Sequence, residues 1–387
     1  MSSQDYDCIV IGAGVHGSFT AYNLAKKNRR TILLEQFVLP HSRGSSHGQT
    51  RVIRKAYEQD YYTQMMEECY QLWFQLEKEA NVKLYRRTGL LVMGPERGVS
   101  FPAIKSTLQR NKIPMMTLQR KEFSQHIPNV NLTPGHEALV DMSAGVLYAD
   151  RTLKTVQDLF QKLGGVIKDG QKVIDITPGS VVTVTTTSGV YRAKSLVITA
   201  GPWANTLLSY TGLQLPLQVL KINVCYWREK VPGFYNIQQH FPCFIQLEPE
   251  EARNDIYGLP SNEYPGLMKI CYHSGFETDP DERDRQTDRG DIDILQRYIT
   301  SCFPGLVPTP AIVESCMYTV TPDHHFVLDN HPTHSNIVIG AGFSGHGFKF
   351  GPIVGKLLCE LSQGEVPSYD LAPFRIRRFQ ALSKSAL

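Results

Sequence analysis

Residues 6–35 read YDCIVIGAGVHGSFTAYNLAKKNRRTILLE, and the order of residue types in this stretch decides the fold. An apolar run from Asp7 to Ile11 predicts a strand, and three glycines separate it from a segment with apolar residues at helical spacing. A second apolar run, Thr31 to Leu34, ends at Glu35. Strand, glycine-rich turn, helix, strand and terminal acid follow in this order in dinucleotide-binding βαβ units.

The three glycines form the pattern G-x-G-x-x-G, and each has its own physical reason. Gly12 permits the tight turn, Gly14 lets the backbone approach a pyrophosphate at the helix N-terminus, and Gly17 allows helix and strand to pack closely. Glu35 is placed to bind the adenosine ribose hydroxyls and would repel a 2′-phosphate. The pattern therefore favours a dinucleotide other than NADP over a glycine-rich turn with no ligand.

The same plan recurs near the C-terminus, where residues 336–361 read NIVIGAGFSGHGFKFGPIVGKLLCEL. Gly340, Gly342 and Gly345 again spell G-x-G-x-x-G, but no strand with a terminal acid follows. We therefore assign this passage to the far end of the same cofactor. A helix beginning near Pro352 would point its positive end at a ring carbonyl that gains charge on reduction.

Composition indicates a globular chain of 387 residues, of which 42% are apolar and 10% aromatic. A chain of this size buries a large core in two domains or in one elaborate domain. The 40 Lys and Arg residues exceed the 37 Asp and Glu residues by three, and they are dispersed. Neither nucleic acid nor a membrane is therefore expected as a partner, and we expect a small ligand.

The cysteines and the N-terminus indicate the compartment. Eight cysteines are spread from Cys8 to Cys359 without a C-x-x-C pair, which argues against a disulfide framework and a structural zinc site. The first residues, MSSQDYD, lack the basic start and apolar run of a secretory signal, and no run of about 18 apolar residues occurs. We expect a soluble protein of a reducing compartment.

The middle of the chain has α/β organisation with inserted segments. Apolar spacing predicts helices at 64–80 and 151–163 and strands at 172–176, 181–187 and 190–200. Aromatic residues and alternating patterns between about 215 and 315 predict a separate sheet over the nucleotide-binding part. The charged run ETDPDERDRQTDRGD, residues 277–291, is interpreted as a solvated loop.

Residues 267–273, LMKICYH, predict a strand with unusual polar residues on one face. Period-2 alternation places Lys269, Cys271 and His273 on one side of it. A buried lysine is costly unless it has a partner or a function, so this face is a candidate site. The alternative is a lysine that extends its ammonium group to solvent.

Residues 315–326, SCMYTVTPDHHF, raise the question of what their cysteine does. On a strand, Cys316 and Tyr318 point the same way. Cys316 is an inert core thiol, a reactive thiolate, or a metal ligand together with His324 and His325. Adjacent histidines on an extended chain diverge and no standard ligand spacing is present, so a metal site is disfavoured and no metal is expected.

A third candidate cluster is GSSHGQTRVIRKAY, in which Arg51 and Arg54 stand three positions apart. On a helix the two side chains would share a face, and on a strand they would not. The alternative is a pair of solvent-facing arginines.

Four passages together resemble one family. HGQTRVIR from His47, KICYH from Lys269, SCMYTVTPDHHF from Ser315 and AGFSGHGFKF from Ala341 are similar to motifs of the monomeric sarcosine oxidase family, above all its eukaryotic, peroxisomal branch. The similarity covers nearly the whole chain in matching order. It implies an α/β fold with α+β elements, in which an FAD-binding Rossmann-like domain carries an inserted antiparallel-sheet substrate domain, as in D-amino acid oxidase and glycine oxidase. The implied FAD-binding domain is 1–85, 145–215 and 316–387, and the substrate domain is 86–144 and 216–315.

The resemblance implies a covalent cofactor. In this family the cysteine at the position of Cys316 is joined through sulfur to the 8-methyl carbon of the FAD isoalloxazine ring. Arg51 would lie near the flavin and lower the pKa of the attacking thiol. The expected FAD-binding residues are Cys316, Gly12, Gly14, Gly17, Glu35, Gly342, Gly345 and His346.

The resemblance also implies roles around the substrate. Arg54 and Lys349 match groups that hold the substrate carboxylate, and His273 and Tyr318 match residues that line the same pocket. Tyr257 resembles a mobile aromatic gate. Lys269 matches a lysine beside flavin N5 that is linked to oxygen activation. The expected catalytic residues are Lys269, His273, Arg51 and Tyr318, with Arg54, Lys349 and Tyr257 binding the substrate.

The implied activity is oxidation of a small secondary amino acid by hydride transfer to FAD, followed by reoxidation with oxygen. Sarcosine would give glycine, formaldehyde and hydrogen peroxide, whereas L-pipecolate, and L-proline as a further substrate, would give cyclic imines. Three alternatives stay open: a primary or D-amino acid oxidase, a flavin dehydrogenase with a protein acceptor, and a non-catalytic flavin-binding protein. The family implies a monomer.

The last three residues, Ser385, Ala386 and Leu387, resemble a peroxisomal address imperfectly, because a basic residue usually stands at the middle position. We expect a peroxisomal location and contact with the import receptor through this end, with the cytoplasm as the alternative.

Overall fold

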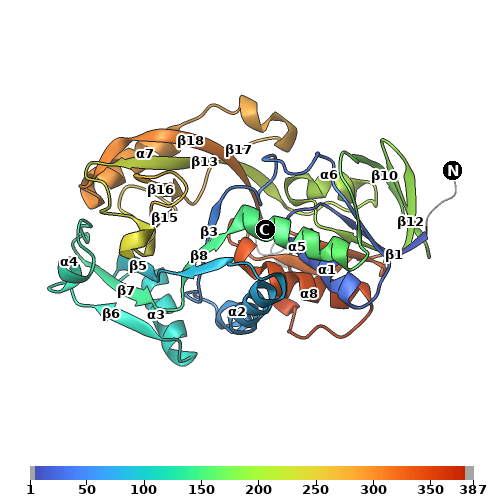
Figure 1. Cartoon of the computed structure of the whole chain (residues 1–387), viewed down its shortest axis with the longest axis horizontal. Coiled ribbons are helices and arrows are strands. Elements are labelled where there is room, and N and C mark those ends of the chain that lie inside the picture. The colour runs from blue at the N-terminus through green and yellow to red at the C-terminus, as the bar shows by residue number, and fades with distance from the viewer. Residues whose placement is uncertain (1–4, 380–387) are drawn as a thin grey trace, which may run out of the picture.

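The computed structural model describes residues 5–379, and its two large sheets lie toward opposite ends of the long axis (Figure 1). Within these residues the first sheet has eight strands in the order β10-β11-β12-β1-β2-β9, with β20 paired to β12 and β19 to β20. The strands are β1 (Asp5–Ile11), β2 (Thr31–Leu34), β9 (Val166–Lys168), β10 (Val173–Thr177), β11 (Val182–Thr186), β12 (Val190–Ile198), β19 (Val327–Asn330) and β20 (Ile337–Ala341). β1 pairs in parallel with both β2 and β12, so it lies at the centre.

Both faces of this sheet are covered, as a parallel sheet requires. Cys8 and Val10 of β1 pack into the core formed with the helices α1 (Val15–Lys26), α5 (Ala149–Lys162) and α8 (Gly351–Ser362). Ile9 and Ile11 point to the other face, where α6 (Ala204–Ser209) packs. The continuous apolar run of β1 follows from burial on both sides.

The second sheet is largely antiparallel and, in the part of the chain that the structure describes, has nine strands. Their order is β17-β13-β16-β15-β14-β5-β7-β6, with β18 paired to β13. The strands are β5 (Leu90–Pro95), β6 (Met115–Leu118), β7 (His136–Asp141), β13 (Gln218–Glu229), β14 (Cys243–Gln246), β15 (Ile256–Leu259), β16 (Leu267–Tyr272), β17 (Phe276–Glu277) and β18 (Leu306–Val320). The accompanying helices are α3 (Ser100–Arg110), α4 (Phe123–His126) and α7 (Gly290–Cys302).

A small third sheet connects the two large ones. It consists of β3 (Thr50–Ile53), β4 (Tyr85–Arg87) and β8 (Gly145–Tyr148) in the order β3-β8-β4. The helix α2 (Asp60–Ala80) follows β3 and packs against α8. Because β3 sits between the two large sheets, its side chains reach the space that separates them.

Most expected elements agree with the structure. The strand Thr31–Leu34 has the predicted bounds, and β10, β11, β12 and α5 differ from the prediction by one or two residues. The predicted helix at 64–80 begins four residues earlier, at Asp60. Its first turn contributes the buried aromatic Tyr62, which the apolar spacing from Met65 onward did not include.

The interpretation of residues 277–291 as a solvated loop is only partly right, because most of these side chains are exposed but the run also contains helical turns and a buried arginine. Pro280–Arg285 forms a 3₁₀ helix, and Gly290 begins α7. Arg283 is buried, with a guanidinium that donates to the carbonyls of Ser42 and Arg43. The charges are thus used to dock this segment on residues 42–43, which sequence periodicity cannot reveal.

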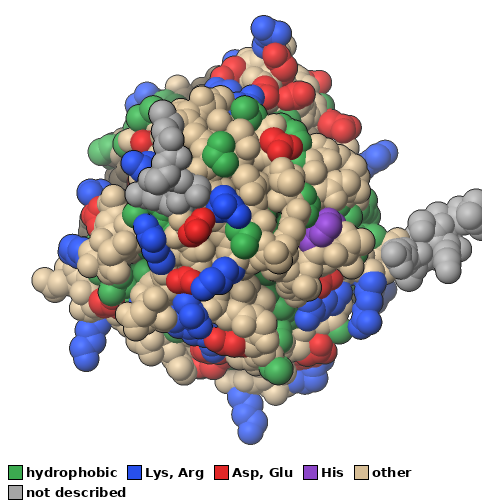
Figure 2. Space-filling model, turned by 90° about the vertical axis from the view of Figure 1, so that its right-hand side faces the viewer, with side chains coloured by type: hydrophobic (Ala, Val, Ile, Leu, Met, Phe, Trp, Pro, Cys, Tyr) green, Lys and Arg blue, Asp and Glu red, His purple; other side chains and the backbone are tan. Residues whose placement is uncertain are grey.

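The predicted division into two domains remains a prediction, and its boundary after residue 315 falls inside β18. On the face at the β10–β12 end, basic and acidic side chains are interspersed (Figure 2). Within residues 5–379, no helix combines the length and the apolar character needed to cross a bilayer.

Candidate active site

A cavity of about 830 Å³ lies between the two large sheets, with β3 in its wall. It extends from the turn between β1 and α1 to side chains of β15, β16 and β18. Every site residue expected from the sequence lines it except Gly17 and Gly342. The residues brought together are Gly12, Gly14, Glu35, Arg51, Arg54, Tyr257, Lys269, His273, Cys316, Tyr318, Gly345, His346 and Lys349.

The glycine-rich turn brings strand and helix into close contact. Gly12 has φ +98°, and a Cβ there would lie 2.5 Å from the carbonyl oxygen of Thr199. A Cβ on Gly17 would lie 1.9 Å from the carbonyl oxygen of Gly12. No larger residue fits at either position without moving the backbone, so the N-terminus of α1 is held open toward the cavity.

Glu35 stabilises this turn directly. Its carboxylate accepts hydrogen bonds from the backbone N–H of Ala13 at 2.9 Å and of Phe37 at 3.0 Å. His41 Nε2 lies 3.4 Å from the same carboxylate. Each carboxylate oxygen can accept a further hydrogen bond, so Glu35 can hold the loop and still bind a hydroxyl group.

Two features of the cavity wall suit a dinucleotide flavin, the N-terminus of a helix and an unpaired histidine nitrogen. The N-terminus of α1 has no acidic residue in its first turn and its N-cap residue Gly14 has no side chain, so its positive end faces the cavity with only Ser46 Oγ bound to the Val15 N–H. His47 donates through Nε2 to the Ser315 carbonyl, at 3.0 Å. Its buried Nδ1 has no hydrogen-bond partner among residues 5–379. An unpaired buried acceptor at the cavity wall is costly, which suits a ligand that supplies a donor.

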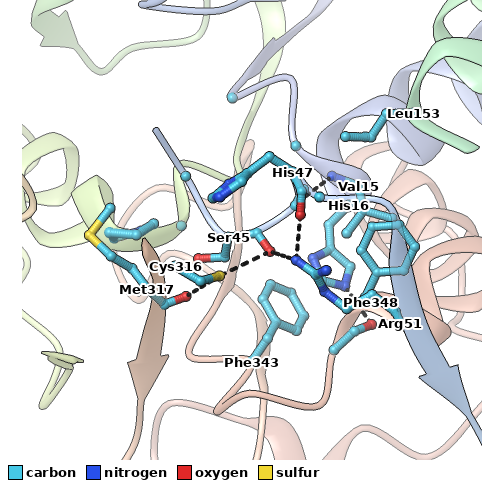
Figure 3. A pocket seen from close by; sticks show the side chains of 18 of the residues that line it. Val15, His16, Ser45, His47, Arg51, Leu153, Cys316, Met317, Phe343 and Phe348 are labelled. Atoms are coloured by element: carbon cyan, nitrogen blue, oxygen red, sulfur yellow. Dashed lines mark hydrogen bonds between the residues drawn. The ribbon is translucent and has the colours of Figure 1, made fainter. Parts of the chain in front are cut away.

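Cys316 and Arg51 meet at one backbone carbonyl (Figure 3). The Ser45 carbonyl accepts from Arg51 Nη2 at 2.9 Å and lies 3.9 Å from Cys316 Sγ. Arg51 also donates to the carbonyls of Thr50 and His47 and lies over the Phe348 ring. A guanidinium fixed by three carbonyls therefore stands beside the thiol.

The other cysteines lie in apolar surroundings. Burial raises the pKa of Cys8 and Cys69 to about 12 and that of Cys302 and Cys359 to about 11. A raised pKa keeps these thiols protonated and unreactive. Of the four, none lines the cavity.

Lys269 is a buried lysine with an acidic partner. Its side chain is 6% exposed, and Nζ lies 3.5 Å from Glu263 Oε1, whose side chain is 2% exposed. Nζ also donates to the Thr50 carbonyl at 3.2 Å. The predicted strand alternation is confirmed, because Met268, Ile270 and Tyr272 pack in the core on the opposite face.

Lys349 is a buried lysine without an acidic partner. Nζ donates to Tyr57 Oη at 2.9 Å and to the His346 carbonyl at 2.8 Å. Arg54 lies over the Tyr57 ring at 4.2 Å. Within the described chain, neither Lys349 nor Arg54 has a carboxylate within 4.0 Å. Burial, with the positive charge of Arg54, holds the pKa of Lys349 well below its usual value.

His273 is within the electrostatic influence of Lys349 and contacts the hydroxyl of Tyr318, which in turn contacts Tyr257. Burial, with the charges of Arg54 and Lys349, lowers the pKa of His273 to about 3, so its imidazole is neutral. Tyr318 Oη lies 3.3 Å from His273 Nδ1 and 3.2 Å from Tyr257 Oη. These groups together form an uncharged wall beside the cations.

Several residues of the site were not predicted. Tyr57 and Glu263 each contact a candidate lysine, yet neither belongs to a motif with a chemical signature. His47, Ser45 and Ser46 precede the Arg51 motif, and Ser46 Oγ accepts from the Val15 N–H at 3.0 Å. Two serines beside a histidine, a few residues before a strand, were the only signal for these contacts.

The site has the polarity expected for an anionic substrate and a flavin. Basic and acidic side chains both line the cavity, and two of the basic ones, Arg54 and Lys349, have no carboxylate within 4.0 Å among residues 5–379. Among the described residues, no group of three His, Cys, Asp or Glu side chains is arranged to hold a metal ion. Carboxylate binding, electrostatic stabilisation and redox chemistry of a bound cofactor are the functions these side chains can perform.

The sequence profile of the family described as FAD dependent oxidoreductase matches residues 7–361. The chain is 56% identical over 385 residues to the human protein named peroxisomal sarcosine oxidase, covering 99% of this chain and 98% of that one. It is 35% identical to the monomeric sarcosine oxidase of Bacillus sp. strain NS-129, over the full length of both chains. The solved structure of NikD, described as an unusual amino acid oxidase, superposes with a TM-score of 0.83 at 23% identity, covering 97% of this chain and 98% of that one.

Proposed function

This chain belongs to the FAD dependent oxidoreductase family, and from that premise we propose that it is an amine oxidase acting on small secondary amino acids. The human and Bacillus relatives are named sarcosine oxidases, which supports sarcosine as a substrate. L-pipecolate and L-proline carry the same groups, a secondary amine beside a carboxylate. The observation that carries the proposal is a pair of basic side chains in the cavity wall, Arg54 and Lys349, neither of which has a carboxylate within 4.0 Å among residues 5–379.

Arg54 and Lys349 bind the substrate carboxylate. Two charge-assisted hydrogen bonds of about 1.5–3 kcal/mol each would orient a small amino acid in the cavity. Among residues 5–379 both groups contact carbonyls, a hydroxyl and aromatic rings, so each can still pair with the negative charge of a bound carboxylate. Tyr257 and Tyr318 lie close by and enclose the apolar part of the substrate.

The surrounding charges also favour loss of the amine proton. An amine with a lysine-like pKa of about 10 costs roughly 4 kcal/mol to deprotonate at pH 7. Nearby cations lower that pKa, and the neutral His273 beside Tyr318 can accept a hydrogen bond from the amine. Only the neutral amine has the lone pair that expels a hydride.

FAD, when bound, accepts the hydride and is reoxidised by oxygen with release of hydrogen peroxide. Gly12, Gly14, the N-terminus of α1 and Glu35 would hold its dinucleotide part. Gly345 and His346 would border the ring end. Gly17 and Gly342 act by close packing behind the cavity wall, since neither lines it. Lys269 would stabilise the negative charge that develops on oxygen.

Cys316 is proposed as the point of covalent attachment, through Sγ to the 8-methyl carbon of the flavin ring. The support is its place in the cavity wall and the carbonyl that it shares with Arg51. Intact mass after denaturation tests the bond. We expect added mass corresponding to FAD, which Cys316→Ala removes. Unmodified mass in flavin-replete protein would contradict the attachment.

Hydrogen peroxide release on addition of sarcosine or L-pipecolate tests the function. We expect one peroxide per substrate consumed, and a strong decrease in turnover for Arg54→Met. No peroxide with any secondary amino acid would refute the proposal. Turnover with a protein acceptor but not with oxygen would indicate a dehydrogenase, and turnover of glycine or D-alanine alone would indicate a primary amino acid oxidase.

The peroxisome is the proposed location, because the human and mouse relatives are named peroxisomal. The expected import signal, Ser385 to Leu387, lies outside the described residues. Fluorescence of an N-terminally tagged chain should coincide with catalase, and a diffuse signal would contradict the location. A monomeric state is supported by the names of the bacterial relatives and is tested by light scattering.

A further inference from the structure

We propose that Glu263 is a positioning residue that keeps Lys269 protonated and oriented in the cavity wall. The proposal rests on the function proposed above, because it assigns the source of the charge that assists the reaction with oxygen. Glu263 lies in the loop between β15 and β16, and Lys269 lies in β16. No sequence signal marks Glu263.

The geometry sets this pair apart from the other ion pairs. The side chains of Glu263 and Lys269 are 2% and 6% exposed, and Oε1 lies 3.5 Å from Nζ. The carboxylate also accepts a hydrogen bond from the Thr50 hydroxyl. The Thr50 carbonyl in turn accepts from Lys269 at 3.2 Å. One residue of β3 therefore holds both partners, which fixes the direction of the lysine side chain.

Physical chemistry explains why a partner is needed. A buried ammonium group without a counter-charge loses its proton, because burial disfavours the charged form. Removal of one member of a buried pair leaves an uncompensated charge. Glu263 therefore allows a cation to stay at this point of the cavity in the absence of substrate, whereas a neutral amine could not stabilise negative charge on oxygen.

The other groups around Lys269 cannot replace Glu263. Lys269 Nζ lies over the face of the Tyr226 ring, 5.7 Å from its centroid, and this ring carries no negative charge that could pair with the ammonium group. Asp150 at the start of α5 is influenced by Lys269, but no ion pair joins them, and burial raises the pKa of this carboxyl. The thiols of Cys243 and Cys271 have raised pKa values because they are buried. Glu263 is thus the carboxylate in contact with the lysine.

The main test measures the second-order rate constant of the reduced holoenzyme with oxygen between about pH 6 and pH 9.5. We expect Glu263→Gln to approach the wild-type rate constant at the acidic end and to fall at least about tenfold below it near pH 9, where the unpaired lysine is neutral. Glu263→Asp, which keeps the charge, should restore most of the rate at high pH. The same rate constant and pH profile for Glu263→Gln and wild type would overturn the proposal.

A second readout does not depend on turnover. At the acidic end of the range the midpoint potential of the bound flavin should rise in Glu263→Gln, since a negative charge is lost while the ammonium remains. The matched control is Glu229→Gln, which removes a buried carboxylate at the end of β13 that, among residues 5–379, accepts hydrogen bonds from the N–H groups of Gly233 and Tyr235. This control should lower the melting temperature and leave both potential and pH profile unchanged. An unchanged potential in Glu263→Gln would count against the proposal.

A double variant covers the case in which Glu263→Gln does not fold. Lys269→Met with Glu263→Gln removes both charges, so no uncompensated charge remains. If Glu263 acts through Lys269, the double variant should react with oxygen as Lys269→Met does, within about twofold. A further fall in the double variant would show that Glu263 acts in another way. Absence of peroxide from wild type with any amino acid would refute the proposed function, whereas the potential measurement would still test Glu263.

Discussion

The two buried lysines of the cavity, Lys269 and Lys349, sit in opposite electrostatic surroundings. Lys269 contacts a buried carboxylate, whereas Lys349 lies near the guanidinium of Arg54 and, among the described residues, contacts a hydroxyl, a carbonyl and two aromatic rings but no carboxylate. A buried lysine that contacts an acidic side chain has its positive charge stabilised by the protein. A buried lysine without such a partner has its charge stabilised only when an anionic ligand binds. Under the proposed function, the Lys269 end would serve oxygen and the Lys349 end would serve the substrate carboxylate.

The largest effect is expected for Lys269→Met, and this substitution tests whether the two lysines have separate functions. Removal of one preorganised charge that stabilises a developing anion costs about 10²–10³-fold in rate. We expect this loss in the reaction of reduced enzyme with oxygen and little change in flavin reduction by substrate. Stopped-flow measurement of the two half-reactions checks it. Equal slowing of both would mean that the two ends of the cavity do not have separate functions.

The mirror-image prediction concerns Lys349→Met. Loss of one charge-assisted contact of about 1.5–3 kcal/mol corresponds to roughly 10- to 150-fold weaker substrate recognition. We expect this decrease in the second-order rate constant of flavin reduction, with the oxygen reaction largely preserved. The same stopped-flow experiment gives both values. A substrate half-reaction unaffected by the substitution would remove Lys349 from carboxylate binding.

The lowered pKa of Lys349 predicts proton uptake on anion binding. In the empty site burial and Arg54 favour the neutral amine, and a bound carboxylate shifts the equilibrium back to the ammonium form. Calorimetric titration with a carboxylate that has no amine, such as cyclopentanecarboxylate, in buffers of different ionisation enthalpy should detect uptake of up to about one proton. Lys349→Met should abolish it. Equal binding enthalpies in all buffers would contradict the prediction.

The smallest expected effect is on the pH dependence of stability, and it comes from His273 at the Lys349 end of the cavity. Its pKa is about 3 in the folded protein and about 6.5 in an unfolded chain. Between these values the unfolded state binds more protons, so stability falls as the pH drops below about 6.5, by about 2 kcal/mol at pH 5. Urea unfolding at pH 7.5 and pH 5 should show a smaller loss for His273→Asn than for wild type. His126→Asn, at an exposed position, should not change the loss.

The local chemistry of the fold could be read from the sequence. The strand and glycine pattern at residues 6–35 was sufficient to predict β1, α1 and β2, because each depends on neighbours a few positions away. Alternation placed Lys269 and His273 on the face that lines the cavity. The family resemblance supplied the roles that residue patterns left open, such as those of Cys316 and Arg54.

Contacts between distant segments were not accessible in the same way. The hydroxyl of Thr50 meets Glu263 across 213 positions, and no periodicity connects them. The docking of Arg283 on residues 42–43 was missed for the same reason, because the rest of this charged run is mostly exposed. The contact of Tyr57 was likewise missed, because its partner Lys349 stands 292 positions away, in the 3₁₀ helix Phe348–Phe350 before α8.

The sequence by itself determined that a dinucleotide fold begins at the N-terminus and that a lysine, a cysteine and two arginines stand in chemically suggestive patterns. The tertiary structure alone decided which of those cations have an acid beside them and which do not. The physical reason is that secondary structure follows short-range spacing along the chain, whereas the charge state and use of a buried group depend on every residue packed around it.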